Sequence, residues 1–306
     1  MSDFEQQLKK VREETGFIAA LDQSGGSTPK ALGQYGVTED KWSNDDEMFD
    51  LVHQMRSRIV TADAFSGKRI IGAILFEGTM NKEIVGKGSA DFLWSEKNVV
   101  PFLKVDKGLE DEANGVQLMK AMPGLDDLLD QAKGKGVFGT KMRSVVKQAD
   151  EDGIKKIVDQ QFEVGMQIVA KGLVPILEPE VDINCPDKQK AEDIILKHLM
   201  AGLDGLSDEQ VMFKLTLPET AKHYRPCIDH KNMVKVVALS GGYPRDEANR
   251  RLAQNPKMVA SFSRALVEGL VDQMSDAEFN SHLDKGIESI YPVSYTHLTL
   301  PTIYSV

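Results

Sequence analysis

Short apolar runs alternate along this chain with longer stretches in which apolar residues recur about every 3.6 positions. Short runs that are partly β-branched and lack polar alternation are typical of strands buried on both faces of a parallel sheet. They predict eight strands, at Phe17–Leu21, Arg69–Phe76, Val99–Val105, Val137–Lys141, Leu173–Leu177, Val211–Leu215, Val234–Leu239 and Met258–Phe262.

The stretches between the runs predict helices, and the segment from Ser207 to Gln210 predicts a further helix N-terminus. Strands that alternate with helices indicate an α/β fold, either a (β/α)8 barrel (a TIM barrel) or a doubly wound sheet. The apolar runs alone do not separate these two folds. The predicted helices are Lys41–Val60, Gly124–Lys133, Gln148–Lys171, Lys188–Gly202, Asp246–Leu252 and Ser275–Ile290.

A polar residue ends or directly follows each predicted strand. In a (β/α)8 barrel these carboxyl ends meet at one mouth, where catalytic groups gather. Structural turns would favour Gly, Asn or Ser there, whereas this set holds three lysines and three acids. The pattern therefore favours a barrel with an active site at its mouth. The eight residues are Asp22, Glu77, Lys104, Lys141, Glu178, Lys214, Ser240 and Ser261.

Lys214 lies inside the apolar run Val-Met-Phe-Lys-Leu. Burial and nearby cations, which Lys141 and Arg143 would supply, both favour the neutral and nucleophilic form of a lysine. The alternative is a lysine on an edge strand whose side chain reaches water. The residues around Lys214 leave both interpretations open.

Two acids, Glu178 and Glu180, flank Pro179 directly after a strongly apolar run. Proline keeps this backbone extended, and we expect the two carboxylates to point to opposite sides. At least one would then face the mouth as a general acid/base. The alternative is a pair of solvated loop acids.

The loops after the last two strands could bind a phosphate, as such loops commonly do in barrels. Ser240, Gly241 and Gly242 would supply backbone N–H groups, and Ser261 lies on the neighbouring loop. Arg264 would add a forked cationic donor.

A second glycine-containing loop, Asp22-Gln-Ser24-Gly-Gly-Ser27, follows the first strand. Its backbone could hold another anion, and Lys104 could complete that site with a cation. Two anion sites on either side of a reactive lysine predict a sugar bisphosphate as substrate.

In order and type, these motifs resemble those of class I fructose-bisphosphate aldolases, in particular the shorter bacterial members. The similarity runs from about Phe17 to Leu270. It is carried by Ala-Leu-Asp22-Gln-Ser24-Gly-Gly-Ser27, Lys104-Val-Asp-Lys-Gly, Lys141-x-Arg143, Leu-Val-Pro-Ile-Leu-Glu178-Pro-Glu180, Phe-Lys214, Leu-Ser240-Gly-Gly and Ser261-x-x-Arg264-Ala-Leu. Ala31 departs from the arginine of many animal members, and Phe262-Ser263 departs from a Tyr-Gly pair.

The resemblance implies reversible cleavage of fructose 1,6-bisphosphate to dihydroxyacetone phosphate and glyceraldehyde 3-phosphate. Lys214 would form an imine with the substrate ketone, and Glu178 would act as acid/base. Lys141 and Glu180 would orient and tune this pair, and Asp22 would handle substrate hydroxyls. Ser240, Gly241 and Arg264 would hold the C1 phosphate, and Gly242 and Ser261 would also bind substrate. Ser24, Ser27 and Lys104 would hold the far phosphate, and Arg143 would also contact substrate.

An imine stabilises the carbanion electronically, so the resemblance implies neither a metal nor another cofactor. The six histidines are scattered, and we interpret Cys227 and His230, three residues apart, as structural or surface residues. Three alternatives stay open. They are another Schiff-base barrel such as a transaldolase-like or monophosphate enzyme, a metal-dependent aldolase or sugar-phosphate isomerase, and a non-catalytic binding protein.

Composition narrows the function classes further. A net charge of −10 argues against nucleic acid and acidic membranes as partners. Two cysteines fit a reducing cytoplasm, and the polar start of the chain, Met1–Glu14, is unlike a secretion signal. Association into a homo-oligomer is compatible with this composition. We expect residues 1–292 to form one barrel domain, and we interpret the uncharged run 293–306 as a non-native tail translated from adapter or vector DNA.

Overall fold

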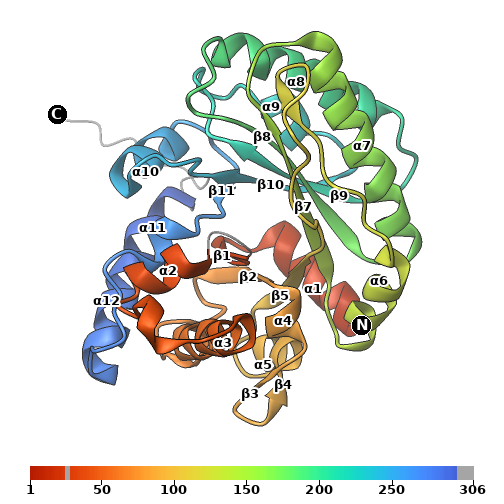
Figure 1. The fold of residues 1–306 in the computed structure, drawn as a ribbon. Coiled ribbons are helices and arrows are strands. Elements are labelled where there is room, and N and C mark those ends of the chain that lie inside the picture. The colour runs from red at the N-terminus through yellow and green to blue at the C-terminus, as the bar shows by residue number, and fades with distance from the viewer. Residues whose placement is uncertain (25–27, 295–306) are drawn as a thin grey trace, which may run out of the picture.

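Parallel strands form the centre of the molecule, and helices surround them (Figure 1). The computed structural model describes residues 1–24 and 28–294, and only the backbone of Arg264 and Ala265. In chain order the parallel strands are β1 (Phe17–Leu21), β2 (Ile70–Leu75), β5 (Val100–Lys104), β7 (Gly139–Val146), β8 (Val174–Val181), β9 (Val211–Thr216), β10 (Met233–Leu239) and β11 (Met258–Ala260).

Neighbouring strands in this sheet are also successive parallel strands along the chain. The Ala20 N–H of β1 donates to the Phe262 carbonyl, beyond β11, at 3.4 Å, and this bond links the first and last strands. The sheet is thus a nearly closed (β/α)8 barrel, and the predicted fold class is confirmed. Short strands lie outside this order: β6 (Val116–Gln117) pairs antiparallel with β7, and β3 (Glu83–Ile84) pairs with β4 (Lys87–Gly88).

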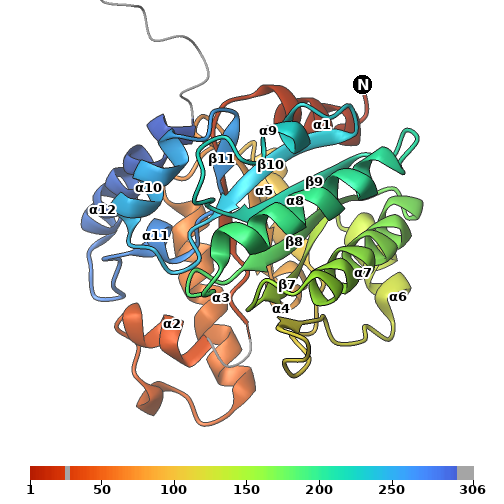
Figure 2. The same cartoon turned by 90° about the horizontal axis from the view of Figure 1, so that it is seen from above.

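The helices cover the outside of the barrel, and α7 and α8 pack against each other beside β8 (Figure 2). In chain order the helices are α1 (Asp3–Glu13), α2 (Thr28–Gln34), α3 (Asp45–Thr61), α4 (Glu77–Met80), α5 (Ser89–Ser95), α6 (Leu125–Gly134), α7 (Glu151–Ala170), α8 (Lys188–Asp204), α9 (Arg225–Ile228), α10 (Arg245–Ala253), α11 (Arg264–Val267) and α12 (Asp276–Ile290). Single 3-10 turns, η2 and η3, span Glu39–Lys41 and Pro292–Ser294.

One predicted helix start is wrong. The segment from Ser207 to Gln210 leads directly into β9 without a helix. The Asn232 side-chain amide donates to the carbonyls of Ser207 and Glu209, at 3.0 and 2.8 Å. These bonds use carbonyls that a helix would need for its own hydrogen bonds, and they hold the segment as a connection.

Two apolar clusters stabilise the barrel. The larger lies between the strands and the surrounding helices, and the smaller fills the barrel interior around Phe102 and Phe138. Gly72 and Gly139 make room for Phe102, because a Cβ at either position would lie 3.0 Å or less from its ring. Side chains therefore fill the interior of the barrel below its mouth.

Helix α1 closes the end of the barrel opposite the mouth. Its Val11 belongs to the interior cluster, and the Phe4 ring lies 5.1 Å from that of Phe138. The helix begins with a capping box in which Ser2 and Glu5 bond each other's backbone N–H. The polar start of the chain is thus an amphipathic helix that completes the core.

Candidate active site

A chain of alternating acids and lysines crosses the mouth of the barrel. Lys141 Nζ on β7 lies 2.6 Å from Asp22 Oδ2, beyond β1, and 3.0 Å from Glu178 Oε2 on β8. The other Glu178 oxygen, Oε1, lies 3.0 Å from Lys214 Nζ on β9. Four residues predicted from separate segments are therefore brought together.

All four side chains are less than one-tenth exposed. Lys214 lies on a strand that pairs with both β8 and β10, so it is not an edge-strand lysine that reaches water. Two ammonium and two carboxylate groups balance one another, which makes their joint burial tolerable. A substrate group that enters here meets ionised side chains with little competing water.

Burial and neighbouring charges shift the pKa values of Asp22 and Lys141 in opposite directions. Burial alone would raise the pKa of Asp22, but Lys141 and Lys214 together lower this pKa below its usual value. Burial alone would lower the pKa of Lys141, whereas Asp22 and Glu178 together raise it above the usual value. Asp22 and Lys141 therefore stay ionised at neutral pH.

A second set of charges lies beside the first. Arg143 Nε on β7 lies 2.5 Å from Glu180 Oε2 on β8. Burial by itself would lower the pKa of Arg143, and Glu180 and other nearby acids raise it. Asp106 accepts from the Arg143 backbone N–H at 3.2 Å and lies 2.8 Å from Lys104 Nζ. Asp106 thus joins Lys104 to the strand that carries Lys141.

The expected directions of Glu178 and Glu180 are wrong. Both lie on the same face of β8, because side chains two residues apart in a strand share a face. Their partners, Lys141 and Arg143, are likewise two apart on β7. Both strands extend further than predicted, so these acids are strand residues and not solvated loop acids.

A cavity of about 930 Å³ opens at this mouth. Its size and mixture of apolar walls and converging charges suit a small phosphorylated molecule. Of the predicted site residues, it is lined by Asp22, Ser24, Lys104, Lys141, Arg143, Glu178, Lys214 and Gly242.

Other predicted site residues do not line this cavity, and some lie outside the described residues. Glu180 contacts the site through Arg143. Ser261 is 2% exposed, and its hydroxyl has no hydrogen-bond partner among the described residues. Ser27 and the side chain of Arg264 lie outside the described residues.

The glycines after β10 have the backbone that the predicted phosphate loop requires. Gly241 and Gly242 have φ values of 60° and 115°, in the region that favours glycine. A Cβ on Gly241 would lie 2.7 Å from Ile183 Cγ2. This loop lies next to Ser240, whose carbonyl accepts from the Tyr243 N–H at 2.9 Å.

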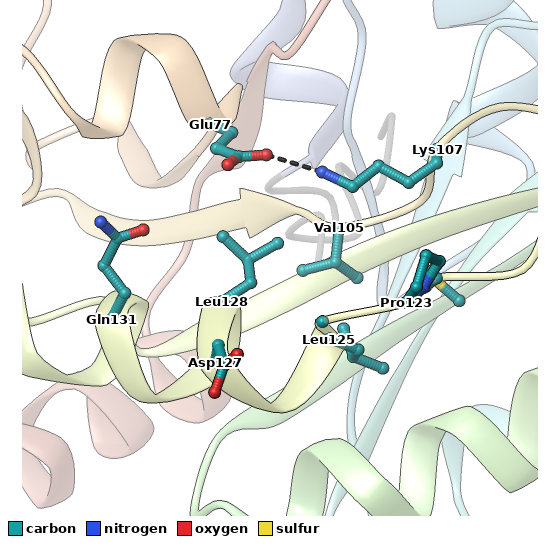
Figure 3. Close-up of a pocket in the computed structure, with 10 residues that line it drawn as sticks. Glu77, Val105, Lys107, Pro123, Leu125, Asp127, Leu128 and Gln131 are labelled. Atoms are coloured by element: carbon teal, nitrogen blue, oxygen red, sulfur yellow. Dashed lines mark hydrogen bonds and ion pairs between the residues drawn. The ribbon is translucent and has the colours of Figure 1, made fainter.

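Glu77 does not join the active site. Its carboxylate lies 2.7 Å from Lys107 Nζ, at the edge of a separate cavity of about 400 Å³ (Figure 3). Val105 and Leu128 are among the apolar residues that line that cavity. Glu77 opens α4, and the turn of this helix carries its side chain to the outside of the mouth.

Three residues of the site went unpredicted. Asp106 lies two positions after Lys104, and strand alternation could have placed them together. Gln161 on α7 is buried and accepts from the Glu178 N–H at 3.2 Å. Arg56 lies on the apolar face of α3, four residues from both Val52 and Val60, which is an unusual place for an arginine.

In the described part of the chain, no cluster of three or more His, Cys, Asp or Glu side chains could hold a metal. Cys227 is buried, and His230 lies 3.3 Å from Asp204. No helix within residues 1–24 and 28–294 has the length and apolar character to cross a membrane.

Comparisons with known proteins agree with this geometry. The family model for class I fructose-bisphosphate aldolase matches residues 4–225. A class 1 fructose-bisphosphate aldolase from Porphyromonas gingivalis is 57% identical over 289 residues, 94% of this chain and 98% of that protein. One from Synechocystis sp. is 57% identical over 293 residues, 95% of this chain and 98% of that protein.

A solved structure of fructose-bisphosphate aldolase from Plasmodium falciparum, in complex with TRAP and a small-molecule inhibitor, has a similar fold. It matches with a TM-score of 0.73 and 20% identity over 98% of this chain and 97% of that chain. At this identity the likeness concerns the fold alone.

Proposed function

The chain belongs to the class I fructose-bisphosphate aldolase family, and we propose that it cleaves fructose 1,6-bisphosphate through an imine on Lys214. The observation that supports this most is the contact of Lys214 Nζ with Glu178 Oε1, at 3.0 Å inside the barrel mouth. A nucleophile and a proton acceptor in direct contact are what imine formation needs.

Glu178 first accepts a proton from the Lys214 ammonium, which frees the nitrogen lone pair. The amine attacks the C2 ketone and gives a carbinolamine. Glu178 then returns its proton to the carbinolamine hydroxyl, which leaves as water, and a protonated imine remains. Lys141 stays charged throughout, because Asp22 and Glu178 raise its pKa. It orients Glu178 and does not compete as a nucleophile.

The imine then accepts the electrons of the breaking carbon–carbon bond. Glu178 removes the proton of the C4 hydroxyl, the C3–C4 bond breaks, and its electron pair forms an enamine. Glyceraldehyde 3-phosphate leaves as the aldehyde. Protonation of the enamine at C3 and hydrolysis of the imine release dihydroxyacetone phosphate. Asp22, at the edge of the same ion-pair chain, holds a substrate hydroxyl.

The two phosphates bind at opposite ends of the cavity in this proposal. The C1 phosphate is held by Ser240, Gly241, Gly242, Ser261 and Arg264. The positive φ values of the two glycines support it, because they let backbone N–H groups approach an anion. Ser24, Ser27 and Lys104 hold the far phosphate, and Ser24 and Lys104 line the cavity.

Cleavage of fructose 1,6-bisphosphate, measured with and without a strong chelator, tests this function. We expect full activity in chelator, because the imine supplies the electron sink that a metal would otherwise provide. Loss of activity that added zinc restores would falsify the imine route. A cytoplasmic location and a homo-oligomer stay predictions; the two cysteines, Cys185 and Cys227, are free and buried.

A further inference from the structure

Arg56 is a buried cation close to the active-site mouth. It lies on α3 and is 2% exposed. Burial lowers the pKa of Arg56 to about 10, although the nearby Asp22 acts to raise it. At neutral pH the guanidinium is therefore charged and removed from water.

No carboxylate among the described residues is in direct contact with the charge of Arg56. Nη1 donates to Thr79 Oγ1 at 2.8 Å, and Nη2 donates to the Gln23 carbonyl. Nε is buried with no partner among the described residues. Asp22 acts on Arg56 through its charge and without a hydrogen bond, and its carboxylate contacts Lys141 instead. A buried charge without a carboxylate in contact with it is costly to the folded state.

The hydrogen bond to Gln23 links Arg56 to the cavity wall. Gln23 and Ser24 both line the active-site cavity, and Arg56 is not among its lining residues. In a trans peptide the carbonyl and the following N–H point in opposite directions. A Gln23 carbonyl held by Arg56 therefore directs the Ser24 N–H away from the guanidinium. Arg56, which does not itself line the cavity, thus fixes the orientation of the Gln23–Ser24 peptide.

We propose that Arg56 is a positioning residue that selects for the far phosphate of the substrate. It acts by fixing the Gln23–Ser24 peptide and by adding positive potential to that wall of the cavity. This inference rests on the proposed placement of the far phosphate near Ser24 and Lys104. A phosphate there would supply the negative charge that Arg56 otherwise lacks.

Substrates with and without the far phosphate separate this role from a purely structural one. Arg56→Gln removes the charge but keeps an amide donor for Gln23. We expect it to lower kcat/KM for fructose 1,6-bisphosphate by about tenfold or more, mainly through a higher KM. We expect kcat/KM for fructose 1-phosphate to stay within about twofold. Arg56→Lys keeps the charge and should recover part of the bisphosphate preference.

Arg69→Gln is the matched control. Arg69 is a less buried arginine, and its carboxylate partners Asp284 and Glu288 lie on α12. The Arg69→Gln variant should change thermal stability. It should leave unchanged the ratio of kcat/KM for fructose 1,6-bisphosphate to kcat/KM for fructose 1-phosphate.

The proposal would be overturned if the Arg56 variants lost kcat/KM equally for both sugars, or lost it for neither. If Arg56→Gln fails to fold, the same comparison with Arg56→Lys decides, since a single ammonium cannot reproduce both guanidinium hydrogen bonds and should still penalise only the bisphosphate. Borohydride trapping of dihydroxyacetone phosphate distinguishes failure of the inference about Arg56 from failure of the proposed aldolase function. A wild-type protein that neither traps this ketone nor cleaves the bisphosphate contradicts the proposed function itself.

Discussion

Two buried lysines contact Glu178, and their surroundings assign them different chemistry. Lys141 also contacts Asp22, and the two acids raise its pKa, so it remains an ammonium ion. Lys214 contacts Glu178 alone among the described carboxylates. Glu178 can therefore relieve Lys214 of its proton, whereas Lys141 would keep its own.

Borohydride reduction in the presence of dihydroxyacetone phosphate tests this assignment. The adduct should map to Lys214, and Lys214→Met should abolish it. Lys141→Met serves as the matched control and should retain the adduct at a lower rate of formation. Glu178→Gln should slow adduct formation by roughly 10²–10⁴-fold, as is typical for lost acid/base catalysis. An adduct that maps to Lys141 would reverse the two roles.

The ion pair of Asp22 with Lys141 should also be visible in stability against pH. The native pKa of Asp22 lies below its unfolded value of about 3.9. The pair therefore stabilises the fold above about pH 4, and this contribution is lost as pH falls towards the native pKa. Asp22→Asn should be less stable at pH 7 by up to roughly 3–5 kcal/mol. Urea unfolding at pH 7, 5, 4 and 3 should show the difference narrowing below pH 4; a constant difference would contradict the linkage.

At the residue scale, sequence patterns predicted the charged side chains that end apolar runs. They did not predict the helix side chains that hold the site residues in place. Lys141, Glu178 and Lys214 stand out because charge inside an apolar strand needs a reason. Gln161 lies on a helix, where polar residues are ordinary, and only packing reveals that it faces β8. Arg56 gave a signal, its place on the apolar face of α3, but the sequence did not show its contact with the Gln23 carbonyl. Glu77 shows the opposite error, since its place at a strand end does not fix where its side chain points.

At the scale of elements, α7 holds β7 and β8 in register through Gln161. Its Nε2 donates to Ser144 Oγ on β7 at 2.9 Å, and its Oε1 accepts from the Glu178 N–H on β8 at 3.2 Å. The side chain is fully buried. One helix residue thereby fixes the backbone position of the proposed acid/base.

Replacement of Gln161 by leucine should therefore affect both stability and turnover. The unpaired Glu178 N–H should cost roughly 1–3 kcal/mol in the free energy of unfolding. Displacement of Glu178 should lower kcat by about 10–100-fold. Gln160→Leu is the control, because Gln160 bonds only the Met119 backbone, away from the site. Urea unfolding and steady-state kinetics of both variants measure the two effects; equal kcat in the two would contradict the positioning role.

The elements themselves were largely predictable. The eight strands and six long helices lie within a few residues of their predicted ranges, because burial on both faces leaves a strong apolar signal. The short helices α2, α4, α5, α9 and α11 were missed, since elements of four to seven residues show too little periodicity. Helix α1 was missed for another reason: of its buried residues Gln7, Lys10 and Val11, two are polar, so they leave no apolar periodicity in the sequence.

At the scale of the whole molecule, closure of the barrel involves the last described residues of the chain. The 3-10 turn Pro292–Ser294 packs against β11 and α12. Ser294 is 1% exposed, and its hydroxyl accepts from the Ala260 N–H of β11 at 3.0 Å. Val293 also packs against the main core cluster. These two residues belong to the start of the proposed tail, yet they contact the barrel.

Two truncations, one after Ser294 and one after Pro292, therefore test where the native fold ends. Residues 295–306 carry no Asp, Glu, Lys or Arg, and several are β-branched, a composition that favours strand-like association when exposed. Truncation after Ser294 should leave thermal stability and the rate of fructose 1,6-bisphosphate cleavage nearly unchanged, with better solubility. Truncation after Pro292 should lower the free energy of unfolding by roughly 1–3 kcal/mol relative to truncation after Ser294, because the buried Ala260 N–H loses its acceptor. A protein truncated after Ser294 that folds but has lost most of its turnover would show that the tail is native and contributes to catalysis.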